Sequence, residues 1–156
     1  MTLVTTDFRV KFDQMGKISL MRVEGQLTDE SLPELYEVSR QYSDAIDARV
    51  SIVDLSSVSE FDVSSQSIWK LARQKPGSVD PTRGCFIVAP EGYAFGLCRM
   101  FQILGEAARP RLQIVRTMGE AFAEIGIQSP WPNSERDKSG TITLQQARAA
   151  LQTAIL

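Results

Sequence analysis

Apolar and polar residues alternate near the N-terminus, which is the pattern of a strand with one covered face. Phe8, Val10 and Phe12 carry this alternation, and residues 18–25 form a second apolar segment after a turn-like sequence that contains Gly16. Because the two segments are short and close together in the sequence, they predict a β-hairpin at the start of the fold.

Further along the chain, nearly continuous apolar runs alternate with segments of helical periodicity. Such runs are typical of strands that are covered on both faces of a sheet, and they lie at residues 50–55, 85–89 and 112–115. Apolar residues at helical spacing predict helices that begin near residues 31, 64, 91 and 118. Strands that alternate with helices after a first hairpin predict an α/β fold with a mixed, mostly parallel sheet.

The length of 156 residues fits one domain with a C-terminal addition. We assign residues 1–127 to the domain, because the alternation of strands and helices ends there. Residues 128–156 are predicted to be a linker and a helical extension. The linker is rich in Pro, Ser and charged residues, and apolar residues at helical spacing follow from Thr141 to Leu156.

Composition excludes several classes of protein. The formal net charge is −2 and the basic residues form no run, which argues against a nucleic-acid partner. No apolar stretch approaches the length of a membrane span, and the N-terminus lacks the pattern of a signal peptide. Cys85 and Cys98 lie within apolar segments, as reduced core thiols do. These features predict a cytoplasmic protein.

The chain contains no histidine, which removes the Ser-His-Asp and Cys-His catalytic arrangements. It also removes histidine-ligated zinc, and two cysteines alone make a poor zinc site. Asp54 and Asp62 flank a loop without any further clustering of carboxylates, so we expect no metal site and no cofactor. The composition therefore predicts that the protein is not an enzyme.

Two serines, Ser64 and Ser65, lie between the strand predicted at 50–55 and the next helix, after a turn. Asp62, Ser64 and Ser65 would place hydroxyls beside the free backbone N–H groups of the first helical turn. Ser is a common helix N-cap, and a serine in this position is also a candidate for phosphorylation or for recognition by a partner. Both interpretations stay open, and they are compatible with each other.

The helix predicted for residues 91–107 has a second apolar face beside the one that a sheet would cover. We consider three interpretations: both faces are covered within the fold, the second face forms a homodimer interface, or it lines a groove for an apolar ligand. Tyr93, Gly96, Met100 and Ile103 form this second face, and Phe95 and Arg99 belong to a mixed outer side of the helix. All six are candidate ligand or interface residues.

The segment Val53-Asp-Leu-Ser-Ser-Val-Ser-Glu-Phe-Asp-Val-Ser-Ser65 resembles the signature of STAS domains, the fold of bacterial anti-sigma factor antagonists. In that family an apolar strand runs into Asp-Ser-Ser-Gly, and the second serine of that motif is phosphorylated. Without a gap, Asp62 matches the family aspartate and Ser64 the phosphorylated serine, whereas Val63 and Ser65 replace the first serine and the glycine. A gap of one residue would instead place Ser65 at the phosphorylated position.

A second segment, Val88-Ala-Pro-Glu-Gly-Tyr-Ala-Phe-Gly-Leu-Cys-Arg-Met-Phe101, is similar to small uncharacterised bacterial proteins described as SpoIIAA-like or STAS-SEC14-like. The resemblance covers residues 7–127. It implies a STAS-like sheet with helices, no established catalysis, and a protein or a small apolar molecule as the partner.

The sequence thus predicts a non-catalytic regulatory or protein-interaction module of STAS type. A serine at the start of the second helix would switch its interactions when it is phosphorylated. The alternative prediction is a carrier or sensor of a small apolar or lipid-like ligand.

Overall fold

The computed structural model describes residues 6–13, 16–74, 83–90, 92–127 and 141–143. These residues form strands and helices in the order β1 (Thr6–Asp13), β2 (Ile18–Thr28), α1 (Ser31–Ala45), β3 (Val50–Asp62), α2 (Ser65–Arg73), β4 (Gly84–Val88), α3 (Tyr93–Leu104), β5 (Leu112–Val115), α4 (Met118–Ile125) and β6 (Thr141–Thr143).

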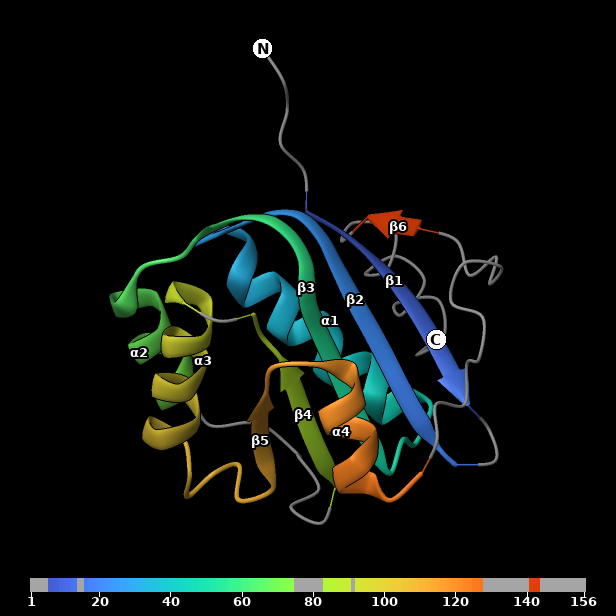
Figure 1. Cartoon of the computed structure of the whole chain (residues 1–156). Coiled ribbons are helices and arrows are strands. Elements are labelled where there is room, and N and C mark those ends of the chain that lie inside the picture. The colour runs from blue at the N-terminus through green and yellow to red at the C-terminus, as the bar shows by residue number, and fades with distance from the viewer. Residues whose placement is uncertain (1–5, 14–15, 75–82, 91, 128–140, 144–156) are drawn as a thin grey trace.

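All six strands join one sheet in the order β5-β4-β3-β2-β1-β6 (Figure 1). Strands β2, β3, β4 and β5 run parallel to one another, whereas β1 pairs antiparallel with β2 on one side and with β6 on the other. The predictions of an N-terminal hairpin and of a mixed, mostly parallel α/β sheet are confirmed.

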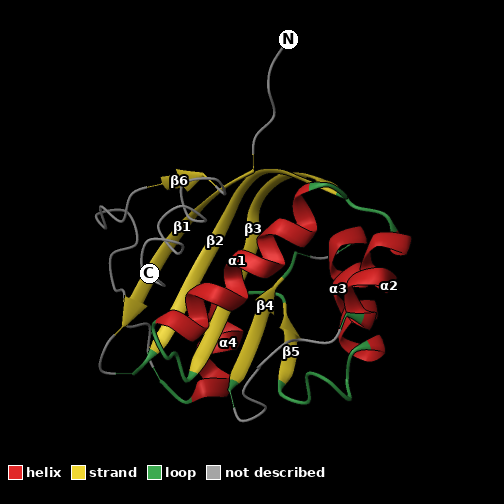
Figure 2. Ribbon diagram, turned by 180° about the vertical axis from the view of Figure 1, so that it is seen from behind, coloured by secondary structure: helices red, strands yellow, loops and turns green. Residues whose placement is uncertain are grey.

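Helices cover both faces of the sheet. Figure 1 shows α4 in front of the strands, and Figure 2, from behind, shows α1 across the opposite face with α2 and α3 beside it. Alternate residues of β2 follow this division: Ile18 and Leu20 pack in the core with Phe122 of α4, whereas Met21 and Val23 pack in the core that contains α1, α2 and α3. This double cover explains the nearly continuous apolar runs of the parallel strands.

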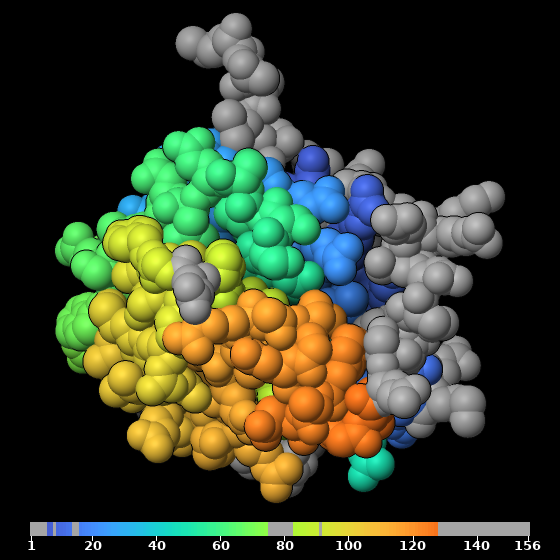
Figure 3. All heavy atoms as spheres, viewed as in Figure 1, coloured from blue at the N-terminus to red at the C-terminus, as the bar shows by residue number. Residues whose placement is uncertain are grey.

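Strand β3 is longer than the sequence predicts. The expected strand ends at Leu55, but residues 56–62 remain extended because β2 continues beside them as far as Thr28, which pairs with Asp62. Irregularities in register after Arg22 and Gly25 accompany this extension. The neighbouring strand β4 ends at Val88, opposite Asp54, so the distal part of β3 projects past it and carries exposed polar side chains (green in Figure 3).

Two helix predictions need correction. Helix α3 spans residues 93–104 instead of 91–107, because Gly92 takes a positive φ of 92° before it and Gly105 caps it. At the C-terminus, Thr141–Thr143 is a strand and not the first turn of a helix, since its backbone pairs with β1 over Asp7 to Arg9. The predicted linker at 128–140 and the remainder of the predicted helix, residues 144–156, lie outside the described residues.

Candidate functional site

The turn between β3 and α2 places two serine hydroxyls at the amino end of a helix. Ser64 is the N-cap of α2, and its Oγ accepts a hydrogen bond from the backbone N–H of Ser67 at 3.2 Å. Ser65 is the first residue of the helix and is exposed, and its hydroxyl has no hydrogen-bond partner among the residues that the structure describes. Asp62, also exposed, ends β3. The capping role therefore belongs to Ser64, and the accessible hydroxyl belongs to Ser65.

The loop between β2 and α1 contributes a carboxylate to this turn. Asp29 Oδ1 accepts a hydrogen bond from the backbone N–H of Ser64 at 2.7 Å. This bond, more than the hydrogen bonds from the Ser67 and Ser64 side chains, holds the pKa of Asp29 below its ordinary value. Because Asp29 is ionised at neutral pH, a negative group added to the Ser64 side chain would meet a carboxylate at close range.

Tyr93 joins the start of α3 to the same turn. Its hydroxyl donates a hydrogen bond to the carbonyl oxygen of Val63 at 2.7 Å, and its ring meets Phe61 edge to face with 6.3 Å between ring centroids. The ring nevertheless remains 61% exposed. The sequence groups Tyr93 with the second face of its helix, but the structure places it beside Asp62, Ser64 and Ser65 as part of one surface, which we call the serine turn.

The other five candidate residues of α3 differ in how far they are exposed. Phe95 is half-buried beneath the guanidinium of Arg116, which lies 4.5 Å from the ring centroid. Met100 packs partly against the core, whereas Gly96, Arg99 and Ile103 are exposed. The second face is thus only partly covered within the described part of the fold.

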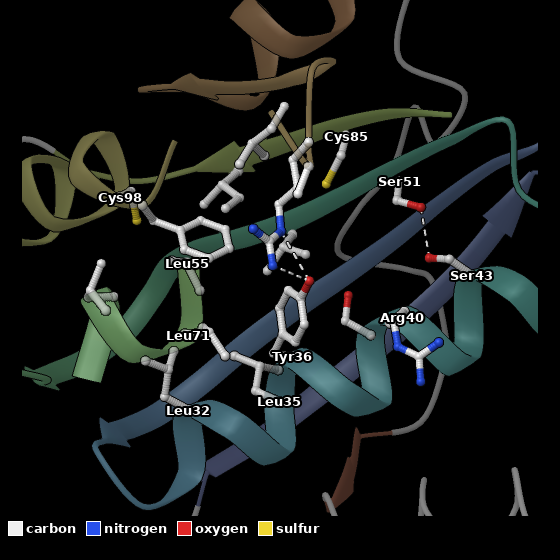
Figure 4. A pocket seen from close by; sticks show the side chains of 18 of the residues that line it. Leu32, Leu35, Tyr36, Arg40, Ser43, Ser51, Leu55, Leu71, Cys85 and Cys98 are labelled. Carbon is white, nitrogen blue, oxygen red and sulfur yellow. Dashed lines mark hydrogen bonds between the residues drawn. The ribbon is translucent and has the colours of Figure 1, made fainter. Parts of the chain in front are cut away.

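A separate apolar pocket lies between α1 and the sheet and extends to α2 and α3. It encloses about 180 Å³ and is lined mainly by apolar side chains. Figure 4 shows Leu32 and Leu35 of α1, Leu71 of α2 and Leu55 of β3 around it, with Cys98 of α3 at one side. None of the six α3 residues proposed from the sequence lines this pocket; the opposite face of α3 does, through Cys98 and Phe101.

Both cysteines line this pocket and carry free thiols. Burial raises the pKa of Cys85 to about 11, although the positive charges of Arg109 and Arg83 oppose the shift. Burial raises the pKa of Cys98 to about 12. Both thiols are therefore protonated and weakly nucleophilic at neutral pH. The two cysteines contribute apolar lining to the pocket and are not reactive groups.

The charged residues of the pocket are all basic in the described part of the chain: Arg40, Arg83, Arg109 and Arg111. Arg40 and Arg83 are ion-paired, since both contact Asp44. Arg109 and Arg111 have no carboxylate partner among the described residues. These arginines form no run in the sequence, and nothing in their local sequence indicates that the fold brings them to one cavity.

No group of three His, Cys, Asp or Glu side chains in the described ranges is placed to hold a metal ion. None of the helices that the structure describes is both long and apolar enough to cross a membrane.

Comparison with known proteins adds a structural relative. No protein-family model matches the chain, and no curated protein matches its sequence. Among solved structures, an anti-sigma factor antagonist from Mycobacterium paratuberculosis is similar, with a TM-score of 0.55 and 19% identity over 81% of this chain and 98% of that one. The chain therefore has a STAS-like fold, as the resemblance of its sequence predicts.

Proposed function

We propose that this protein is a non-catalytic regulatory module that binds another protein through the serine turn. The observation that carries this proposal is the accessible hydroxyl of Ser65 at the amino end of α2, flanked by the exposed Asp62 and Tyr93. The fold supports it, because a structure of the same fold belongs to an anti-sigma factor antagonist. A partner would meet polar groups held by rigid elements, with no enzymatic centre required.

Phosphorylation of Ser65 is the switch that we propose for this module. Ser65 is better suited than Ser64, because the Ser64 hydroxyl caps the helix and lies near the Asp29 carboxylate. A phosphate on Ser65 would lie at the positive end of the α2 dipole, so the domain itself would tolerate the charge. The change would act on the partner, through added charge and bulk at the contact surface.

Intact-mass analysis of protein purified from its native host tests this switch. We expect a species heavier by one phosphoryl group in the wild type and in Ser67→Ala, and its loss in Ser65→Ala. Ser64→Ala should retain the phosphoryl group but lose about 1 kcal/mol of stability with its N-cap. Loss of the modification in Ser64→Ala alone would assign the switch to Ser64, and no modified species under several growth conditions would contradict the switch altogether.

The remaining predictions from the sequence fit this proposal. The protein would act in the cytoplasm, where a reducing environment keeps the half-buried Cys85 and the buried Cys98 as free thiols. The absence of catalysis and a homodimer through α3 stay predictions.

The alternative function, binding of a small apolar molecule, is favoured by the pocket beneath α1 and not by the second face of α3. The cavity of about 180 Å³ is larger than engineered apolar cavities of roughly 150 Å³ that bind benzene. Native mass spectrometry after gentle purification tests this function. We expect an additional mass that extraction with organic solvent removes, and protein of the bare mass from several preparations would count against a resident ligand.

A further inference from the structure

The pocket beneath α1 combines an apolar interior with an uncompensated positive charge. Arg109 lies at its wall, half-buried, with its guanidinium carbon 4.7 Å from the centroid of Phe101 and 5.2 Å from that of Tyr36. These rings hold the guanidinium in place but do not neutralise it. A cation in an apolar pocket without a carboxylate partner in the described residues is an arrangement that favours an anion.

The hydroxyl group of Tyr36, which accepts hydrogen bonds from Arg109, is a second donor in the pocket. Nη2 and Nε of Arg109 donate to the hydroxyl oxygen of Tyr36 at 2.7 and 3.0 Å, shown as the two dashed lines that meet at this oxygen in Figure 4. Since the Tyr36 oxygen already accepts two hydrogen bonds, its own proton is available for donation. No acceptor for that proton lies in the described part of the chain.

The guanidinium of Arg109 occupies space that a side chain at Gly105 would fill. Gly105 caps α3 beside it, and a Cβ at Gly105 would lie 2.5 Å from Nη1 of Arg109 and 3.2 Å from the carbonyl oxygen of Phe101. Nη1 donates at 3.3 Å to the carbonyl oxygen of Ala72, at the end of α2. Nη2 also donates at 3.4 Å to the carbonyl oxygen of Gln74. Arg109 is thus fixed by backbone, hydroxyl and ring contacts, and no carboxylate of the described residues pairs with it.

We propose that this pocket binds a small amphipathic carboxylate. The apolar body of the ligand lies among Leu32, Leu55 and Leu71, and its carboxylate pairs with Arg109 and accepts the hydrogen bond of Tyr36. Arg109 and Arg111 both lack a carboxylate partner among the described residues, but only Arg109 is half-buried, whereas Arg111 is exposed. One half-buried guanidinium at the wall matches a single negative charge, and a cavity of about 180 Å³ matches one ring or a short acyl chain. This inference rests on the alternative function above and specifies its ligand class.

The test compares octanoate with its neutral counterpart 1-octanol, using calorimetry for affinity and amide and Arg Nε–H NMR resonances for location. We expect the wild type to bind octanoate about tenfold or more tightly than 1-octanol, because a hydrogen bond to a charged group is worth that factor. The octanoate shifts should centre on Tyr36 and Arg109. Arg109→Gln should bind both molecules with similar affinity.

Arg49→Gln is the matched control, since Arg49 is exposed, lies outside the pocket lining, and its loss changes the net charge equally. It should retain the full preference for octanoate. The wild-type comparison decides the inference even if Arg109→Gln does not fold. Equal affinity for octanoate and 1-octanol would overturn the anion inference and leave apolar binding intact. Absence of octanoate binding, or NMR shifts confined to another surface, would also overturn it.

Discussion

Replacing Arg22 by methionine is expected to lower the free energy of unfolding by about 3 kcal/mol or more. Arg22 of β2 and Asp54 of β3 are paired residues of adjacent strands, and Nε of Arg22 lies 3.1 Å from Oδ2 of Asp54. Asp54 is fully buried, and its other oxygen accepts the backbone N–H of Ser56 at 2.9 Å. Without Arg22, the buried carboxyl group of Asp54 would lose its ion-pair partner. Urea unfolding measures the effect.

Two further variants separate this effect from the loss of an arginine as such. Arg9 contacts Glu24 across the β1–β2 hairpin at 3.4 Å, but both side chains of this pair are partly exposed, whereas Asp54 is buried. Arg9→Met should therefore cost less than about 1 kcal/mol. Arg22→Met combined with Asp54→Leu should recover much of the stability, since no buried charge remains. The interpretation is wrong if Arg22→Met and Arg9→Met cost the same.

Replacing Leu27 by alanine is expected to cost about 2 to 5 kcal/mol. Leu27 lies in β2 with 0% of its surface exposed, belongs to the core that α1, α2 and α3 share, and forms part of the pocket wall. Truncation to alanine removes apolar contacts and enlarges the pocket. The surrounding core cannot close the space that is left, so the cost in stability is high.

Leu104→Ala is the matched control, because Leu104 ends α3 and is 45% exposed. This variant should change stability by no more than about 0.5 kcal/mol. Thermal or urea unfolding of both variants gives the comparison. Similar losses in both would mean that the interior around Leu27 is much less tightly packed than the structure describes.

Elements with complete local signals are those that the sequence predicts well. Residues 112–115 form β5 as expected, and α4 begins at residue 118 as predicted, after the N-cap Thr117, whose Oγ1 accepts the N–H of Glu120 at 3.1 Å. Gly126 ends that helix with φ of 83°. Each of these features depends on residues within a few positions of one another, so a local pattern is sufficient.

Elements that depend on a distant partner are those that the sequence misses. Residues 56–62 are mostly polar and are predicted to form a turn, but they form a strand because the backbone of β2 pairs beside them. Likewise Thr141–Thr143 has the pattern of a helix start, and its pairing with β1 makes it a strand. In both cases backbone hydrogen bonds between distant segments outweigh local preference.

For the candidate sites the same distinction holds. The hydroxyls at the start of α2 are predictable from local sequence, because strand, cap and helix signals meet within Asp62 to Ser67. Long-range contacts are needed to bring Asp29 to the Ser64 N–H, to bring Tyr93 to the serine turn, and to form the pocket beside α1. A pocket and its charge arise from side chains such as Tyr36 and Arg109, which are 73 positions apart and meet only when the sheet is assembled.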